Sequence, residues 1–361
     1  MAESWDLCII GGGTAGLTVA AGAAQMGAKV VLVEARRMGG DGLHSGCVPV
    51  KALLSAAPQG FDAAMHRVRG VMATLARNDA VERLEGLGIS VILGRARFVA
   101  PTTIEVEGRH LSARRFVIAS GARPLVPGVL RVVPHLTSET VFALNALPRR
   151  LVVAGGGPLG VEMAQAFRRM GAAVAVIEAG VLLAGEDPEL SELARRRLRR
   201  LGVALHEGRP IRAACRKGDS ITVGLEDGTL VEGSHLLAAA GRRPNLDLGL
   251  EAAGIAYGEE GIVVDNALRT SNRRIYAIGE VVDGPRLTQV AGYHAGLVLR
   301  HFLFRLPVRA DATPIPRVVY GEPELAQVGL TEAEARARHG RIEILRWPLS
   351  EVDRAHCDGD V

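Results

Sequence analysis

The sequence predicts an α/β fold organised around two Rossmann-like dinucleotide-binding units. Residues 7–34 run as a short apolar strand, a glycine-rich turn, an alanine-rich helix and a second strand that ends in an acid. Residues 151–178 repeat this order, and the glycines and the acid all recur at the same offset of 144 residues. A shared offset at four positions argues against chance similarity between two glycine-rich turns.

The first unit has a GxGxxG fingerprint between a strand and a helix. Gly11 makes the tight turn, Gly13 lets the backbone approach a pyrophosphate, and Gly16 lets the helix pack closely on the strand. Glu34 ends the second strand, where its carboxylate can accept hydrogen bonds from ribose hydroxyls. This unit therefore predicts one dinucleotide site.

The second unit predicts another dinucleotide site by the same argument. Its equivalent residues are Gly155, Gly157, Gly160 and Glu178. A carboxylate at the position of Glu178 can bind both ribose hydroxyls of NAD(H) but would repel the phosphate of NADP(H), and no arginine follows it closely. We therefore expect a preference for NADH.

The segments between and after the two units alternate between helical and β-rich patterns. Residues 61–87 have a helical pattern, and residues 89–118 contain short β-rich runs. After the second unit, Asp227 and Gly228 predict the turn of a β-hairpin.

The last third of the chain begins with a further strand. Residues 270–284 contain an apolar strand that delivers Glu280 to its end, where the ligands of parallel sheets gather. Residues 287–304 have the pattern of a helix. Three prolines between residues 307 and 316 then indicate a linker, and a final segment begins near Arg317.

The stretch at residues 39–51, GGDGLHSGCVPVK, concentrates the candidate chemistry. Cys47 lies just before Pro49 and the run KALLSAA, at a helix start where unpaired N–H groups and the helix dipole favour a thiolate. Lys51 follows four residues later on the same helical face. A lysine there opposes the dipole, which suggests that it holds an anion or touches an electron-rich ring. The alternative interpretation is a buried, inert Cys47 and a solvated Lys51.

Composition and cysteine spacing indicate a globular intracellular protein. The 361 residues suffice for two or three domains. The N-terminal segment has no basic region before an apolar core, so we expect no signal peptide, no membrane association and a cytoplasmic location. The cysteines lie far apart, without the spacing of a zinc site or of a secreted disulfide scaffold, and we expect no metal centre. They are Cys8, Cys47, Cys215 and Cys357.

The charge pattern argues against a nucleic-acid partner. The net charge of +4 is mild, and the one basic run, RRRLRR at residues 195–200, is interpreted as a solvated helix face. A nucleic-acid surface would join such a run to aromatic residues, which make up only 4% of the chain.

The order of the motifs resembles the flavoprotein pyridine nucleotide-disulfide oxidoreductases, in particular the dihydrolipoamide dehydrogenase and mercuric reductase branch. The stretches that carry the resemblance are both fingerprints, GGDGLHSGCVPVK, ASG, GPLGVE, GRRPN, YAIGE, VAGYHAG and VVYGEPELAQVGLTEAEA. The resemblance implies an FAD-binding domain made of residues 1–147 and 266–310. It also implies an NAD-binding domain at residues 148–265 and the start of an α+β interface domain at residues 311–361.

The resemblance implies roles for individual residues as well. Lys51 would approach the flavin N5 and form an ion pair with Glu162, and Cys47 would make a charge-transfer contact with the flavin. The implied FAD contacts are Gly11, Gly13, Gly16, Glu34, Gly40, Lys51, Ala96, Ser120, Gly121, Glu280 and Gln289. The implied NAD(H) contacts are Gly155, Gly157, Gly160, Glu178 and Gly241.

Three positions depart from the family pattern. The family has a second cysteine five residues before Cys47, where this chain has Gly42, so no local disulfide can form. Val50 replaces a serine, and Glu280 replaces the aspartate that binds the ribityl chain of FAD. Because the glutamate is one methylene longer, we expect FAD to be loosened or slightly shifted.

The interface domain of the family extends further than the last segment of this sequence. It continues for about a hundred residues more, a size typical of a small domain. There it supplies an acid–base pair of histidine and glutamate across a homodimer. No matching histidine occurs in this sequence, which argues against the family homodimer.

These observations favour an FAD-dependent NAD(P)H oxidoreductase. Hydride would pass from NADH to FAD, and electrons would pass on to a small-molecule acceptor such as a quinone, dye, metal ion or oxygen. In a variant of this hypothesis, Cys47 cycles through a sulfenic acid or a mixed disulfide, with Cys357 as a candidate partner. The alternative is a non-catalytic module that binds FAD and NADH.

Overall fold

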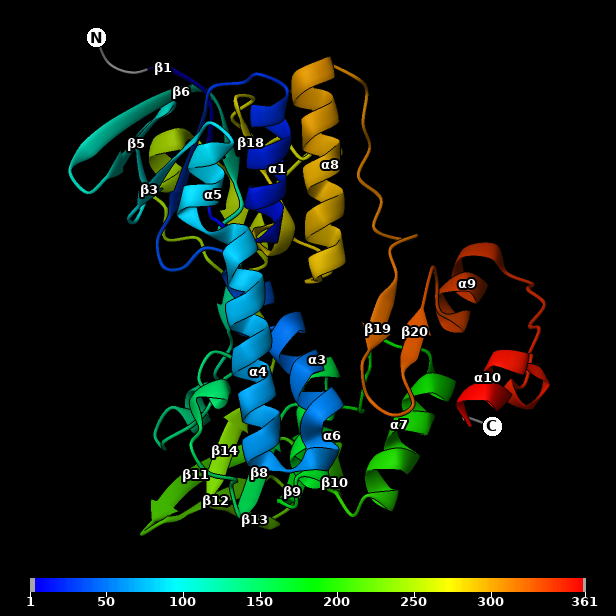
Figure 1. Cartoon of the computed structure of the whole chain (residues 1–361). Helices are drawn as coiled ribbons and strands as arrows, with labels where there is room; N and C mark the ends of the chain where they lie inside the picture. Colours follow the sequence, from blue (N-terminus) through cyan, green and yellow to red (C-terminus); the bar gives the residue numbers. More distant parts are fainter. Residues whose placement is uncertain (1–3, 360–361) are drawn as a thin grey trace. The chain divides into compact units, whose positions relative to one another are not determined.

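The computed structural model describes residues 4–359, without the side chains of Ser4 and Asp358. Its contacts divide the chain into two compact units, which meet in sequence at Val328 and Gly329. The larger unit has the predicted α/β architecture, with two separate sheets, one mixed and one parallel, and helices packed on them (Figure 1).

The first sheet has seven strands and is built around β1 (Ser4–Ile10), which lies between β2 (Val30–Glu34) and β6 (Arg109–Ile118) in parallel pairing. Leu7, Cys8 and Ile9 of β1 are fully buried, as expected for a parallel strand that is covered on both faces. The other strands are β3 (Ile89–Leu93), β4 (Arg97–Ala100), β5 (Thr103–Val106) and β18 (Ile275–Ala277), which pairs with β6.

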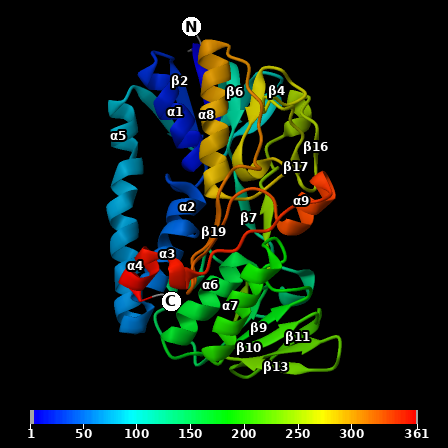
Figure 2. The same cartoon turned by 90° about the vertical axis from the view of Figure 1, so that its right-hand side faces the viewer.

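Two helices cover this sheet side by side (Figures 1 and 2). They are α1 (Thr14–Gln25) and α8 (Thr288–Phe304), and the second agrees with the helix predicted at residues 287–304. A Cβ atom at Gly22 would lie only 2.6 Å from a methyl carbon of Leu299. The small residues of α1 therefore allow the two helices to approach closely.

The second sheet repeats the parallel arrangement with four strands. Their order is β10 (Ala204–Glu207), β9 (Ala173–Glu178), β8 (Arg150–Ala154) and β14 (His235–Ala238). Helices α6 (Pro158–Arg169) and α7 (Pro188–Arg200) pack on this sheet. The predicted repeat of the strand–helix–strand unit is thus confirmed in both places.

The basic run at residues 195–200 lies in α7, and its interpretation as a wholly solvated face was wrong. The Arg195 side chain is only 17% exposed and forms ion pairs with Glu207 at 2.7 Å and Glu192 at 2.5 Å. Leu198 of the same run is fully buried. The run therefore attaches the helix to the sheet as well as facing solvent.

An antiparallel sheet of three strands follows the second unit in sequence. It contains the hairpin predicted at Asp227 and Gly228, where the Thr229 N–H donates to the Asp227 carboxylate at 2.9 Å. Its strands are β11 (Ile211–Lys217), β12 (Ser220–Leu225) and β13 (Leu230–Gly233). Two short pairs complete the β structure of this part: β7 (Ala122–Pro124) with β15 (Arg242–Pro244), and β16 (Tyr257–Gly258) with β17 (Gly261–Ile262).

The segment between β2 and β3 is helical, as predicted for most of it. Its helices are α2 (Gly40–His44), α3 (Cys47–Ala56), α4 (Phe61–Ala76) and α5 (Val81–Gly86). Helix α3 packs against both α4 and α6, and its Val50 and Leu53 are buried in one apolar cluster with Met65 and Phe167. This cluster fixes Cys47 and Lys51 close to the second dinucleotide-binding unit.

The larger unit ends with a hairpin of β19 (Arg317–Val319) and β20 (Leu325–Gln327). The smaller unit contains α9 (Glu332–His339), which begins with a capping box of Thr331 and Glu334, and α10 (Asp353–Asp358). None of the helices described in residues 4–359 is both long enough and apolar enough to span a bilayer.

Candidate functional site

A cavity of about 1370 Å³ in the larger unit connects the two fingerprints. Most of the predicted site residues line it. These are Gly11, Gly13, Glu34, Gly40, Cys47, Lys51, Ser120, Gly121, Glu280 and Gln289, together with Gly155, Gly157, Glu162, Glu178 and Gly241. Three predicted residues do not line it: Gly16 and Gly160 lie in helices behind the turns, and Ala96 is buried in a core cluster.

The two glycine turns have nearly the same geometry. Gly11 has φ +114° and Gly155 has φ +122°, in the region that favours glycine. A Cβ atom at either position would lie within 2.3 Å of a backbone carbonyl oxygen, that of Ala119 or that of Ala239. Both turns therefore require glycine at this position.

Each turn leads into a helix whose N-terminus lacks a side-chain cap. Gly13 and Gly157 are the N-cap residues of α1 and α6, and neither can supply a capping oxygen. The first turns of both helices line the cavity. Their unpaired amide groups and the helix dipole are suited to the pyrophosphate of a dinucleotide.

The acid at the end of each second strand is held by backbone amides. Glu34 accepts hydrogen bonds from the N–H groups of Gly12 at 2.6 Å and Arg36 at 2.7 Å. Glu178 accepts from Gly156 at 2.7 Å and from Gly180 at 2.8 Å. Each carboxylate keeps further acceptor capacity, so both remain able to bind ribose hydroxyls.

Cys47 is the first residue of α3, as its sequence context predicts. Its Sγ lies 3.3 Å from Oγ1 of Thr288, the first residue of α8. A Cβ atom at Gly42 would lie 4.0 Å from the same hydroxyl oxygen. The polar contact of Cys47 is therefore the hydroxyl of Thr288, close to the position where the family has its second thiol. Thr288 is not among the residues predicted from the sequence. All four cysteines are free.

Lys51 and Glu162 both contact Tyr320 instead of each other. The Lys51 Nζ lies 3.8 Å from the centroid of the Tyr320 ring, and Glu162 accepts the Tyr320 backbone N–H at 2.8 Å. The part of the chain described by the structure contains no Lys51–Glu162 ion pair, so that expectation was wrong. The contact agrees instead with the suggestion that Lys51 touches an electron-rich ring.

Glu162 is unusual for a carboxylate because it is only 7% exposed. Burial raises the pKa of Glu162 to about 7, although the Tyr320 N–H and the charge of Lys51 favour the ionised form. This carboxylate can therefore exchange a proton near neutral pH.

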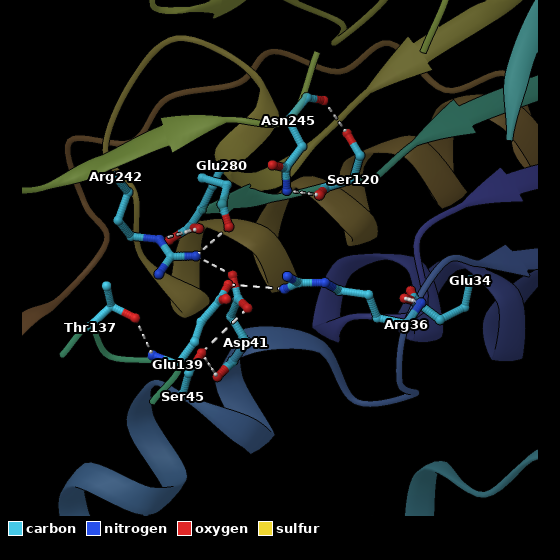
Figure 3. A network of polar contacts seen from close by, with 11 residues as sticks. Glu34, Arg36, Asp41, Ser45, Ser120, Thr137, Glu139, Arg242, Asn245 and Glu280 are labelled. Atoms are coloured by element: carbon cyan, nitrogen blue, oxygen red, sulfur yellow. Dashed lines mark hydrogen bonds and ion pairs between the residues drawn. The ribbon is translucent and has the colours of Figure 1, made fainter. Parts of the chain in front are cut away.

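Glu280 belongs to a charge network that the sequence did not reveal (Figure 3). Its carboxylate binds the Arg242 guanidinium at 2.9 Å, and Arg242 also binds Asp41 and the Ala122 carbonyl oxygen. Burial raises the pKa of Glu280, and Arg242 opposes this effect. Burial lowers the pKa of Arg242, but the two carboxylates outweigh it and hold that pKa above its usual value. The GRRPN motif contains Arg242 but did not identify its partners.

Two further contacts lie along the same wall of the cavity (Figure 3). Ser120 Oγ donates to the Asn245 carbonyl oxygen at 3.0 Å, and the Asn245 amide donates to the Ser120 carbonyl oxygen at 2.8 Å. Arg36 pairs with Glu139 at 3.0 Å. Within residues 4–359, no group of three side chains is arranged to hold a metal ion.

Comparisons with known proteins agree on one family. Residues 5–295 match the family described as pyridine nucleotide-disulphide oxidoreductase, and residues 315–361 match its dimerisation domain. A mercuric reductase of Bacillus cereus is 34% identical over 97% of this chain, and a dihydrolipoyl dehydrogenase of Bacillus subtilis is 33% identical over 97%. The chain spans 60% of the length of the former and 81% of the latter.

A solved structure has the same fold throughout. The Cu(II) complex of the HOCl-induced flavoprotein disulfide reductase of Escherichia coli superposes with a TM-score of 0.92 at 29% sequence identity. The match covers 99% of this chain and 84% of that chain.

Proposed function

Because the chain belongs to the pyridine nucleotide-disulphide oxidoreductases, whose members bind FAD and use NAD(P)H, we propose that it oxidises NADH without a local dithiol. The observation that carries this proposal is the cavity shared by the two fingerprints, with Cys47 and Lys51 in its lining. The acceptor is a small molecule that takes electrons without a disulfide relay at residues 42 and 47.

The residues of the cavity fit two dinucleotides. The uncapped start of α1 and the carboxylate of Glu34 would hold the adenosine diphosphate half of FAD. The uncapped start of α6 and Glu178 would hold NADH in the same way. When bound, FAD supplies a carrier that takes hydride from NADH and passes electrons onward.

The side chains between the two sites supply electrostatics. The Lys51 ammonium lines the cavity without a carboxylate partner among the described residues, so its positive charge can stabilise negative charge that develops there. Cys47 supplies a soft sulfur ligand beside Thr288. The mercuric reductases and the Cu(II) complex among the relatives make Hg(II) and Cu(II) the first acceptors to test.

The preference for NADH rests on Glu178 and on its arginine neighbour. Arg209 lies next to Pro210, which lines the cavity, but its guanidinium pairs with Asp227 at 3.2 Å. Its backbone N–H donates to the Glu178 carbonyl oxygen at 3.1 Å. This guanidinium is therefore engaged elsewhere, and the Glu178 carboxylate would repel the phosphate of NADPH.

An anaerobic NADH titration of the purified protein, followed over the visible spectrum, tests the proposal. We expect a flavin band that bleaches with about one equivalent of NADH and much less readily with NADPH. A reduced protein should then be reoxidised by Cu(II), Hg(II) or a quinone. A flavin that stays oxidised with NADH would contradict the proposal.

A non-catalytic FAD- and NADH-binding module is the second candidate. It is favoured by Gly42 in place of the family cysteine and by the engagement of Glu280 with Arg242, in place of a free acceptor for FAD. The same titration with excess FAD distinguishes the two. Binding of both nucleotides, measured by fluorescence, without bleaching of the flavin band would support the module.

The dimerisation-domain match at residues 315–361 favours the family homodimer, which the missing histidine argued against. Light scattering coupled to gel filtration would give the mass in solution. A mass of one chain would contradict the homodimer.

A further inference from the structure

Lys51 stands out among the basic residues of this chain. Only three of the 43 Lys and Arg residues are lysine: Lys29, Lys51 and Lys217. Lys29 and Lys217 are exposed, whereas Lys51 is half-buried and lines the cavity. The face of Tyr320 is the partner that the structure gives to the Lys51 ammonium.

The position of Tyr320 is determined by contacts of the β19–β20 hairpin with α6 and α7. Beside the bond from the Tyr320 N–H to Glu162, the Glu322 N–H donates to the Gln165 side chain at 2.8 Å. The Glu322 carboxylate binds Arg169 at 2.6 Å and Arg197 at 2.7 Å. These bonds join the hairpin to α7 and to α6, which carries part of the second fingerprint.

We propose that Tyr320 is the residue that positions Lys51 for the reaction, by holding its ammonium against the ring face inside the cavity. This inference rests on the proposed function, because Lys51 acts there on bound nucleotides. Tyr320 is a positioning residue: its backbone is held by Glu162, and its ring orients the lysine.

The ring serves a purpose that a carboxylate would not serve. An ion pair with Glu162 would cancel most of the charge of Lys51 toward the cavity. A cation–π contact holds the ammonium in place and leaves its net positive charge available. In the structure, the Tyr320 N–H occupies one oxygen of Glu162, and the Tyr320 ring contacts the Lys51 ammonium.

Amine labelling with mass-spectrometric readout tests the contact without any need for turnover. Tyr320→Leu should increase the labelling rate of Lys51 several-fold, while Tyr320→Phe, which keeps an aromatic face, should leave it unchanged. Lys29 and Lys217 are internal controls in every sample, and Tyr257→Leu, at an exposed tyrosine, is the matched control variant. Equal Lys51 labelling in the wild type and Tyr320→Leu, or faster labelling in Tyr320→Phe, would overturn the inference.

A second variant keeps the test decisive if Tyr320→Leu does not fold. Glu162→Gln retains an acceptor for the Tyr320 N–H but removes the negative charge. Lys51 labelling should stay at the wild-type rate in Glu162→Gln because the ring holds the ammonium. A several-fold increase would show that the carboxylate holds it instead, and would overturn the inference.

The midpoint potential of the bound flavin connects the contact to the reaction. Tyr320→Leu and Lys51→Met should both lower it, because a nearby cation favours the reduced flavin, and the double variant should lower it no further than Lys51→Met. Additive shifts would overturn the inference. If wild-type protein binds no FAD or is not reduced by NADH, the proposed function fails, but the labelling result still decides on the contact.

Discussion

The two fingerprint regions use the same backbone device and then diverge. In both, the carboxylate at the end of the second strand binds the N–H after the first glycine, Gly12 at 2.6 Å and Gly156 at 2.7 Å. In both, the chain then returns to the turn, where a later backbone N–H donates to the carbonyl oxygen of Gly12 or of Gly156. The donors are Gly39 at 2.8 Å and Leu183 at 2.9 Å.

Beyond this return, only the first region leads to Cys47 and Lys51, two of the predicted catalytic side chains. The chain continues from Gly39 through α2 to Cys47 and Lys51, whereas from Leu183 it continues to the arginine-rich α7. Helix α6 of the second region has a role of its own. Its buried Glu162 and Gln165 hold the β19–β20 hairpin. The repeated part thus suits nucleotide binding, and the connections that are not repeated carry the side chains proposed to act on the nucleotides.

We expect the largest effect from an alanine substitution of one helix glycine in each region, because the two variants should lose different nucleotides. A Cβ atom at Gly16 would lie 1.9 Å from the Gly11 carbonyl oxygen, and at Gly160 it would lie 2.0 Å from that of Gly155. Each alanine substitution should reduce the free energy of unfolding by about 3 kcal/mol. Gly16→Ala should lose FAD, and Gly160→Ala should keep FAD but no longer be reduced by NADH.

Urea unfolding and the flavin absorbance after gel filtration measure these effects. Gly70→Ala in α4 is the control, since nothing lies within 4 Å of a Cβ atom there. It should stabilise the protein by up to about 1 kcal/mol. If Gly16→Ala retained FAD at wild-type stability, the first turn would not be the FAD site.

The next prediction concerns Glu162, the buried acid of α6. The equivalent residue in α1 is the uncharged Thr18. Because the folded pKa of Glu162 is raised from 4.5 to about 7, its stabilising contribution is complete below pH 4.5 and is lost as the pH rises through 7. Compared with Glu162→Gln, the wild type should lose up to about 3 kcal/mol of unfolding free energy over this range. Denaturant unfolding at a series of pH values measures it.

The control for the change in net charge is Glu259→Gln, at an exposed carboxylate. This variant should follow the pH profile of the wild type. Parallel profiles for the wild type and Glu162→Gln would mean that Glu162 does not titrate in this range.

The two strand-terminal acids should have separate effects on nucleotide binding. Glu178→Gln keeps an acceptor for the Gly156 N–H but removes the charge that repels a phosphate. We expect the ratio of kcat/KM for NADH over NADPH to fall by about tenfold or more. Glu34→Gln should weaken FAD binding and leave this ratio unchanged. A similar change of the ratio in both variants would break the assignment of one nucleotide to each region.

The smallest effect concerns a contact that only the first region has. Arg36 follows Glu34 and pairs with Glu139, whereas Gly180 occupies the equivalent position after Glu178. Since the Arg36 side chain is 69% exposed, Glu139→Gln should lower the unfolding free energy by less than about 1 kcal/mol. The difference from wild type should disappear in about 1 M salt. A loss that persists in salt would indicate a contribution other than the ion pair.

The sequence by itself determined the two units and the start of α3. Glycine at positions 11 and 155, an acid at the strand end and an apolar strand–helix pattern are local requirements of backbone sterics and hydrogen bonding. Such requirements involve only a few neighbouring residues, so they can be predicted from the sequence without knowing the fold. The placement of Cys47 at the first residue of a helix followed in the same way.

Only the tertiary structure decided which side chains meet across the cavity. Cys47 meets Thr288 across 241 residues of sequence, and Arg242 meets Asp41 across 201. Lys51 contacts the ring of Tyr320 instead of the expected Glu162, and the hairpin brings the Tyr320 backbone N–H to that carboxylate. These pairings depend on how sheets, helices and a distant hairpin pack together, and no local pattern in the sequence encodes that arrangement.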